Sequence, residues 1–306
     1  MIESIDQYLR QLKAALAGSD RATIQDALAD AQEHLSSALD HAYETYARAS
    51  RAGEARGNLS EAEALRSIVE EYGSPEETAM AYKEIEARTR PTLARVTRED
   101  DRPFVTRFFA VLADPRAWGA LLYMIISMIT GILYFSWVVT GLSVSLGLLI
   151  LIFGMPIAVL FMLSFRGIAL VEGALVEALL GVRMPRRPMF SSKSLGWWER
   201  FKVLVAGKRT WLAIAYMLLL LPLGILYFTV FVTLIALALS FIATPVLEYF
   251  FDLPLITLGD TAYRLPGWLT LVIAFAGVLL LPATMHLAKL VGRVHGAMAK
   301  AMLVSD

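Results

Sequence analysis

Histidine is the residue type in this chain best suited to bind a metal ion or to act as a general acid or base, and the sequence contains four. His34 and His41 are seven residues apart, which places them two helical turns from each other. His286 and His295 are nine residues apart, so they are only loose neighbours on a helix. Because no second histidine stands at ligand spacing and the chain has no cysteine, we expect no metal site and no cofactor.

Nucleophilic catalysis in a membrane would need a serine beside a histidine or a carboxylate. The serines of the first apolar segments have no such neighbour in sequence, and these are Ser127, Ser136, Ser143 and Ser145. The sequence also lacks the glycine-rich ATP lid and the catalytic asparagine segment of a kinase. We therefore expect no enzyme activity.

Transport would need ionisable residues in the central turns of membrane spans. Arg166, Glu172 and His286 all fall near the ends of apolar segments, where snorkelling or an interfacial position explains them. An internal repeat suggests a further hypothesis, in which Glu172 pairs with Arg166 and His295 pairs with Lys300. The sequence disfavours a pump or a channel.

The internal repeat consists of the letters Gly-Ile-Leu-Tyr-Phe, which occur at residues 131–135 and again at residues 224–228 with an offset of 93. A tryptophan and a tyrosine precede each copy at matching positions, namely Trp118, Tyr123, Trp211 and Tyr216. Residues 171–180 match residues 294–303 at an offset of 123. We interpret both matches as an internal duplication, with about 30 residues inserted into the second copy.

The aromatic residues of the repeat form one candidate binding site. An aromatic pocket for an apolar ligand would consist of Tyr134, Phe135, Tyr227 and Phe228. The alternative is a belt at the membrane interface, since these residues are expected near the outer ends of their spans. Gly131 and Gly224 favour close helix packing in lipid, where small residues let backbones approach.

A basic segment between the two halves is the second candidate site. The residues that could bind anionic lipid headgroups are Arg183, Arg186, Arg187, Trp197, Trp198, Lys208 and Arg209. Each basic residue near such a surface contributes about 1 kcal/mol. The alternative is that the charges only orient the chain through the positive-inside rule. The interleaved tryptophans fit a membrane interface better than nucleic acid, so no direct nucleic-acid binding is expected.

The charges divide the chain into two parts. Residues 1–105 hold 20 acidic and 13 basic residues, whereas residues 106–306 hold 8 acidic and 15 basic residues together with the long apolar segments. The mean hydropathy of +0.57 excludes an ordinary soluble protein. We expect a protein of the bacterial inner (cytoplasmic) membrane, without a secretory signal and with cytoplasmic N- and C-termini.

Four apolar segments are long enough to cross a bilayer, and they are residues 118–139, 142–165, 211–231 and 267–287. A further apolar segment, residues 233–250, is interrupted by Pro245. As a re-entrant segment it leaves four spans and puts 14 of the 15 basic residues of this part on the cytoplasmic side, whereas a full crossing gives five spans. The charge bias favours four. Around Gly259 we expect a small extracytoplasmic turn or hairpin.

Apolar stripes in residues 1–90 predict a helical module, with helix starts at Ser19, Ser60 and the Gly73-Ser74-Pro75 boundary. Its motifs are Tyr8-Leu9-Arg10-x-Leu12, Asp30-Ala31-x-Glu33-His34-Leu35, Glu61-x-Glu63-Ala64 and Tyr72-Gly73-Ser74-Pro75-Glu76-Glu77-x-Ala79. In this order they resemble the HAAS-type signalling domain, a helical module of bacterial membrane proteins. The resemblance implies a cytoplasmic protein partner, for which a PadR-type transcription regulator is one candidate.

The membrane part carries further motifs, namely Leu170-x-Glu172-x-x-Leu175-x-x-Ala178-Leu179-Leu180-Gly181, Thr244-Pro245 and His286-Leu287-Ala288-x-Leu290. With the repeated Gly-Ile-Leu-Tyr-Phe letters, they resemble the membrane sensor domain of bacterial sensor histidine kinases over residues 115–303. The sequence stops at Asp306, before the domains that a kinase needs, so the resemblance does not imply kinase activity.

We therefore predict an all-α protein with a cytoplasmic helical signalling module (residues 1–90), a linker and interfacial helix (91–113) and a duplicated transmembrane sensor-like domain (114–306). The expected function is to couple an envelope or lipid signal to a cytoplasmic partner without catalysis. The alternative is a small transporter, a channel or an accessory subunit of a permease complex. Membrane lipids are expected partners, and a homo-oligomer is left open.

Overall fold

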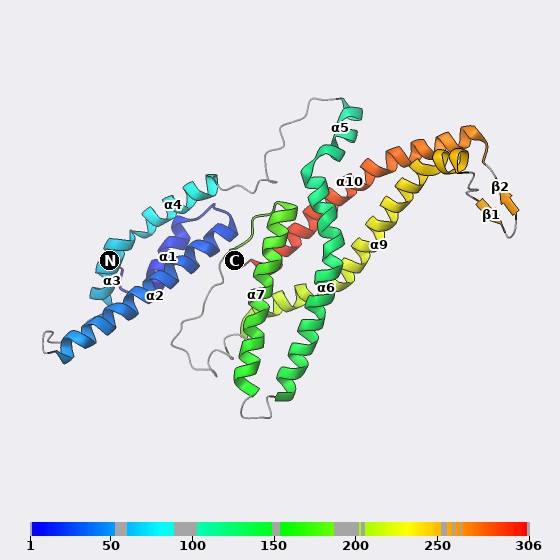
Figure 1. Ribbon diagram of the computed structural model, residues 1–306. Coiled ribbons are helices and arrows are strands. Elements are labelled where there is room, and N and C mark those ends of the chain that lie inside the picture. Colours follow the sequence, from blue (N-terminus) through cyan, green and yellow to red (C-terminus); the bar gives the residue numbers. More distant parts are fainter. Residues whose placement is uncertain are drawn as a thin grey trace.

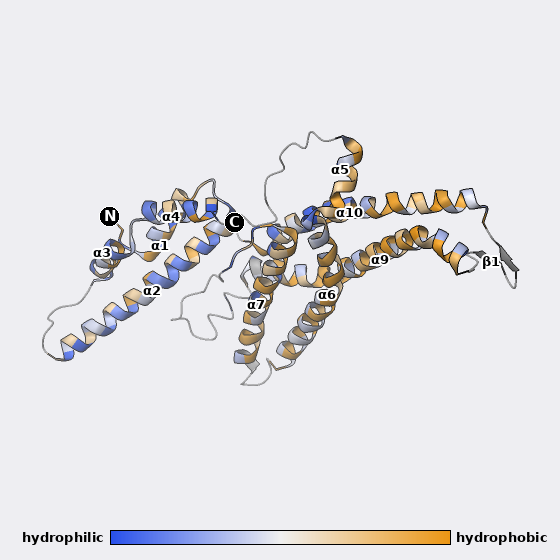
Figure 2. Ribbon diagram, turned by 45° about the horizontal axis from the view of Figure 1, so that its top comes forward, coloured by the Kyte–Doolittle hydropathy of each residue, from blue (hydrophilic) through white to orange (hydrophobic). Residues whose placement is uncertain are grey.

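In the computed structural model, the residues that are described form helices and one short β-hairpin (Figure 1). The structure describes residues 2–52, 60–88, 103–148, 154–186, 202, 206–251, 256–258, 261–263 and 265–304. A polar N-terminal group of helices is followed by long helices coloured as hydrophobic in Figure 2. This arrangement confirms the predicted fold class.

The N-terminal module contains α1 (Ile5–Ala15), α2 (Arg21–Arg51), α3 (Glu61–Tyr72) and α4 (Pro75–Arg88). Their apolar stripes meet in one core, made up of Tyr8, Leu12, Leu16, Ala27, Ala31, Leu35 and Ala79. The hydroxyl of Tyr8 lies 3.0 Å from the carbonyl oxygen of Gly73 and 2.9 Å from the hydroxyl of Thr78, so it ties α1 to the turn before α4. Burial raises the pKa of the Tyr8 phenol.

Side-chain caps fix the starts of the module helices. Ser60 caps α3 and Ser74 caps α4, as the sequence predicts. The hydrogen bonds from Ser74 to the carboxylate of Glu77 hold the pKa of that group below its usual range. The predicted cap at Ser19 is wrong by one residue, because the carboxylate of Asp20 accepts the backbone N–H two positions on and so caps α2.

The second region begins with a short helix, α5 (Phe104–Ala110), and a 3-10 turn, η2 (Val111–Ala113). Within the described residues, four helices that are long and apolar enough to cross a bilayer follow, namely α6 (Pro115–Leu148), α7 (Gly154–Leu180), α9 (Lys208–Phe250) and α10 (Gly267–Leu303). Helices α6 and α7 form one hairpin, α9 and α10 form another, and the two hairpins diverge from a shared crossing (Figure 1). Between α9 and α10, β1 (Ile256–Leu258) pairs antiparallel with β2 (Thr261–Tyr263), which confirms the predicted hairpin.

The number of candidate spans agrees with the prediction, but their boundaries differ. Helix α6 continues through Gly141, which was expected to end it, because this glycine packs against α7 inside the hairpin. Helix α7 continues to Leu180, beyond residue 165, where the second apolar segment was expected to end. Helix α9 continues through Pro222 and Pro245, so residues 233–250 belong to the same helix as the third candidate span and are not a separate segment. Proline removes only one helical hydrogen bond and is tolerated in membrane helices.

The two glycines of the repeat bring α6 and α9 into close contact, as the sequence predicts. A Cβ on Gly131 would lie 2.8 Å from a backbone carbonyl oxygen of α9, and one on Gly224 would overlap a backbone carbonyl oxygen of α6. Only glycine allows this approach at both positions. Tyr123 and Tyr216 each lie eight residues before one of these glycines, so the crossing also sets how near the two tyrosines come.

Candidate functional site

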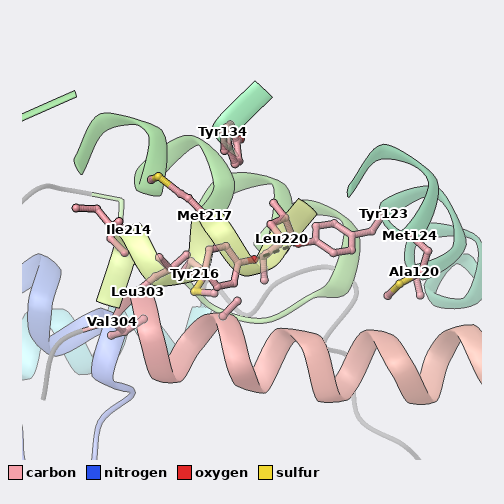
Figure 3. Packing of buried hydrophobic residues seen from close by; sticks show 14 of the residues in the cluster. Ala120, Tyr123, Met124, Tyr134, Ile214, Tyr216, Met217, Leu220, Leu303 and Val304 are labelled. Carbon is pink, nitrogen blue, oxygen red and sulfur yellow. Dashed lines mark hydrogen bonds between the residues drawn. The ribbon is translucent and has the colours of Figure 1, made fainter. Parts of the chain in front are cut away.

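Four polar side chains meet inside the membrane region, one from each long helix. Tyr123 belongs to α6, Glu172 to α7, Tyr216 to α9 and His295 to α10, and each is at most 1% exposed. We call these four residues the polar cluster. The apolar residues packed around it include Met124, Met217 and Leu220 (Figure 3).

Both tyrosine hydroxyls of the polar cluster contact both ionisable groups. The Tyr123 hydroxyl donates to Oε1 of Glu172 at 2.5 Å and lies 2.7 Å from Nε2 of His295. The Tyr216 hydroxyl donates to the same carboxylate oxygen at 3.1 Å and lies 3.0 Å from the same nitrogen. The two hydroxyl oxygens are 3.2 Å apart, a contact drawn in Figure 3. Two hydroxyl bridges therefore connect the carboxyl group to the imidazole.

Two more tyrosines flank the polar cluster. The hydroxyl of Tyr227 lies 3.3 Å from Nδ1 of His295. Tyr134 is buried and interacts through its hydroxyl with Glu172. The second carboxylate oxygen of Glu172, Oε2, is buried and has no hydrogen-bond partner in the part of the chain that the structure describes. Protonation of this carboxyl group must therefore change how completely the polar atoms of the cluster are hydrogen-bonded.

The members of the polar cluster occupy matching positions in the sequence. Tyr123 and Tyr216 are related by an offset of 93 residues, and Glu172 and His295 by an offset of 123. The expected position of Glu172 at a span end is wrong, because α7 continues to Leu180 and the side chain is 1% exposed. The matching sequence positions of the two repeat copies are the signal that could have predicted the polar cluster. The internal duplication itself stays a prediction.

The predicted aromatic pocket overlaps this site in part. Tyr134 and Tyr227 are directed at the carboxyl group and the imidazole of the polar cluster, respectively. Phe135 and Phe228, the residues that follow them, are half-buried. The two tyrosines therefore support the polar cluster, and an apolar ligand at this place stays a prediction.

Two of the basic residues predicted to bind lipid headgroups, Arg183 and Arg186, contact carboxylates, and headgroup binding stays a prediction. Arg183 lies 3.4 Å from the carboxylate of Asp26 in α2 and 3.6 Å from that of Glu177. Arg186 donates its backbone N–H to Asp26 and its guanidinium to Glu177, both at 2.7 Å. Lys208 is exposed. Outside the described residues lie Arg187, Trp197, Trp198 and the side chain of Arg209.

A second ion pair joins the N-terminal module to the membrane region. Lys300 of α10 lies 2.5 Å from the carboxylate of Asp20, the residue that caps α2. The predicted pairing of His295 with Lys300 is therefore wrong. We call the two ion pairs, Asp20 with Lys300 and Asp26 with Arg183, the docking contact. The side chains of Asp26 and Arg183 are only 10% and 16% exposed, so water screens this pair weakly.

Helices α7 and α10 connect the polar cluster to the docking contact. Glu172 lies eleven residues before Arg183, and α7 covers most of that distance. His295 lies five residues before Lys300 on α10, which corresponds to about 7.5 Å along a helix. Each ionisable member of the polar cluster therefore shares a continuous segment with one cation of the docking contact.

The chemistry available to the polar cluster is hydrogen bonding and proton binding. It offers two hydroxyls, one carboxyl group and one imidazole. Within the described residues, no three His, Asp or Glu side chains are grouped so that they could hold a metal ion. The cluster can bind a proton, and its hydrogen bonds join four helices. The packing of these helices therefore depends on the protonation and hydrogen bonding of the cluster.

A family model described as "Putative sensor" matches residues 123–303, which is more than half of the chain. The match includes every member of the polar cluster and both cations of the docking contact. It does not extend to the N-terminal module, whose resemblance to the HAAS-type domain stays a prediction. No curated protein and no solved structure matches the chain.

Proposed function

The chain belongs to this Sensor family, and we propose that it is a non-catalytic regulatory protein that couples an envelope or lipid signal to a cytoplasmic partner. The four long helices receive the signal in the bacterial inner membrane. The helical module of residues 1–90 binds or releases the partner. Both termini lie in the cytoplasm, on the side where the module can meet a soluble protein.

The connection between the polar cluster and the docking contact is the observation that carries this proposal. Arg183 and Lys300 hold the carboxylates of Asp26 and Asp20. Packed helices move as rigid units, so a change in packing at the cluster displaces the ends of α7 and α10. Such a displacement changes the distance from each cation to its carboxylate and so changes the affinity of the module for the membrane region.

The energies involved are large enough for a switch. A pair of unit charges 4 Å apart near a protein surface interacts by about 4 kcal/mol. Allosteric coupling between two sites typically amounts to about 1–3 kcal/mol. Because the pair of Asp26 and Arg183 is largely buried, the loss of one partner leaves the other charge with weaker compensation, from Glu177 at 3.6 Å for Arg183 and from the Arg186 N–H for Asp26. A movement that lengthens one ion pair is therefore sufficient to release the module.

The partners of the proposal are a cytoplasmic protein and membrane lipids. The resemblance of the module to the HAAS-type domain supports a PadR-type regulator as the candidate protein. Helix α4 exposes Met80 (63%) and Ile85 (52%), which gives such a partner an apolar contact on the module. Lipid acyl chains would cover the exposed apolar faces of the four long helices.

The experiment compares partner capture by full-length protein in native membranes before and after the docking contact is reversed. The substitution Arg183→Glu opposes two carboxylates and is expected to release the module, whereas Asp26→Arg added to it restores an ion pair in the opposite sense. We expect a specific protein to be enriched with one of these two states at least several-fold over the other. Equal recovery from both would show that docking does not control the partner.

A second candidate is a small proton-coupled transporter or an accessory subunit of a permease, and the burial of Glu172 and His295 within candidate spans favours it. In this case proteoliposomes would show a flux that Glu172→Gln abolishes and Glu248→Gln leaves intact. Partner capture without any flux favours the regulatory function.

A further inference from the structure

The hydroxyl protons of the polar cluster can be assigned from its distances. A tyrosine hydroxyl carries one proton, so it can donate to only one neighbour while its oxygen accepts from others. Tyr123 and Tyr216 both donate to Oε1 of Glu172, at 2.5 and 3.1 Å. Neither hydroxyl then has a proton left for His295, although Nε2 lies only 2.7 and 3.0 Å from their oxygens. These two contacts are hydrogen bonds only if Nε2 itself carries a proton.

The second ring nitrogen of His295, Nδ1, can then either accept or donate a hydrogen bond. Nδ1 of His295 faces the hydroxyl of Tyr227 at 3.3 Å, and a hydroxyl can take either role. If His295 is neutral, Nδ1 accepts from Tyr227. If it is an imidazolium, Nδ1 donates to Tyr227. Both forms satisfy every contact of the ring.

The charge of the carboxyl group decides how many protons the site must hold. With a neutral imidazole and an ionised Glu172, the cluster would carry a net charge of −1 in a position that is 1% exposed. The groups that contact Glu172 in the described part of the chain are tyrosine hydroxyls, and its Oε2 has no hydrogen-bond partner there. A buried, uncompensated carboxylate is strongly unfavourable. One additional proton, on Glu172 or on Nδ1 of His295, removes the net charge.

We propose that the polar cluster is a buried proton-binding site, in which Glu172 and His295 together hold one proton more than a carboxylate and a neutral imidazole. The titratable groups that face the site from the packed helices are Tyr123 and Tyr134 on α6, Glu172 on α7, Tyr216 and Tyr227 on α9, and His295 on α10. The tyrosine hydroxyls let the proton be shared between the carboxyl group and the imidazole.

The bound proton makes the stability of the membrane region depend on pH with a defined sign. Above about pH 6.5 an unfolded chain has an ionised glutamate and a neutral histidine. The folded state then binds one proton more than the unfolded state, so stability falls as pH rises until the site loses its proton. Over that range the unfolding equilibrium constant of the wild type rises about tenfold per pH unit more steeply than that of a chain without the site.

The test is a denaturation series of the full-length protein in mixed micelles between about pH 7 and pH 8.5, for the wild type and for Glu172→Gln. The glutamine amide keeps an oxygen that accepts from both tyrosines, but it cannot titrate. The unfolding equilibrium constant of Glu172→Gln is therefore expected to lack the tenfold rise per pH unit. Glu248→Gln is the matched control. Glu248 is also buried, but Leu265 N–H and the Thr270 hydroxyl donate to its two oxygens, so we expect the slope of the wild type. Equal slopes for the wild type and Glu172→Gln would overturn the proposal.

A second measurement applies even if Glu172→Gln does not fold. At about pH 8.5 exposed carboxyl groups and histidines are deprotonated. The infrared spectrum of the folded wild type at that pH is expected to show either the carbonyl band of a protonated carboxyl group or the band of an imidazolium. The absence of both bands would overturn the proposal.

Discussion

Glu172 and His295 lie on different helices and are joined by one hydroxyl, because the oxygen of Tyr123 is 2.5 Å from Oε1 of Glu172 and 2.7 Å from Nε2 of His295. Tyr216 makes the same connection from α9 at 3.1 and 3.0 Å. Among long helices that are mostly apolar, hydrogen bonds of this kind fix how the helices are aligned. The polar cluster is thus the point at which the packing of all four long helices is coupled.

Removing one bridging hydroxyl should destabilise the membrane region. We expect Tyr123→Phe to lower the free energy of unfolding by about 1–3 kcal/mol, because Glu172 and His295 each lose a buried partner. Tyr216→Phe should cost less, since its bonds are longer. Denaturation in mixed micelles measures both effects. Tyr249→Phe is the control, because this tyrosine is 62% exposed. Equal losses for Tyr123→Phe and Tyr249→Phe would contradict the prediction.

The close crossing of α6 and α9 predicts that alanine substitutions at two glycines of α6 have different effects on stability. Gly131→Ala places a methyl group 2.8 Å from a carbonyl oxygen of α9, so the helices must move apart at a cost of about 1–3 kcal/mol. At Gly147, also on α6, a Cβ would meet nothing within 4 Å. Gly147→Ala should therefore leave the unfolding free energy unchanged or raise it slightly. The prediction fails if both substitutions have the same effect in the same denaturation assay.

The ion pair between Asp20 and Lys300 should behave as a coupled unit. Asp20→Asn keeps the helix cap, because asparagine caps as well as aspartate, and removes only the charge. Lys300→Met removes the other charge. A double-mutant cycle is expected to give a coupling energy of about 0.5–3 kcal/mol. Its readout is the hydrogen exchange of the first turn of α2 in the full-length protein. A coupling energy of zero would mean that the two charges do not stabilise docking.

The stability that the contact at the start of α6 provides should change with pH in the acid range. Burial alone would raise the pKa of Asp114, but the hydrogen bonds from Lys289 and from the N–H of Arg116 outweigh it and hold the pKa below its usual range. The folded state therefore favours the ionised group, and its contribution is present above about pH 3.9 and lost as pH falls further. Thermal unfolding should show Asp114→Asn less stable than the wild type at neutral pH, with the gap closing on acidification.

Asp40→Asn serves as the control for this series, because Asp40 is exposed. A gap for Asp114→Asn that stays constant down to low pH would show that the side-chain charge is not what stabilises this contact.

The length of the apolar segments was sufficient to predict the helical class and the four candidate spans. Capping residues in the sequence were sufficient to predict the helix starts at Ser60 and Ser74. Helix ends inside the membrane were harder to predict. Thr140-Gly141 and Pro245 resemble stops in a soluble protein, yet both lie inside helices. In lipid, a glycine can serve packing and a proline can be absorbed by a long helix, so neither residue type marks an end reliably.

The polar cluster could be foreseen only in part. The repeat placed Glu172 opposite His295 and Tyr123 opposite Tyr216, but the apolar segment expected to end at residue 165 put Glu172 near a span end. Its burial depends on contacts among four helices far apart in sequence, and local pattern carries no information on such contacts. The pairs of Arg183 with Asp26 and of Lys300 with Asp20 could not be predicted either, since Asp26 on α2 and Asp20 at its cap are more than 150 residues away in sequence.

The transmission of a change from the polar cluster to the docking contact is the central claim, and hydrogen exchange of the full-length protein in nanodiscs tests it most directly. The backbone amides at the start of α2 are the reporters, because Asp20 caps this helix and Asp26 lies within it. We predict that Glu172→Ala accelerates their exchange by roughly 5- to 150-fold, the usual range of allosteric coupling. Glu248→Ala, which removes a buried carboxylate at the far end of α9, should not. Faster exchange around residue 172 with no change at the start of α2 would contradict the account.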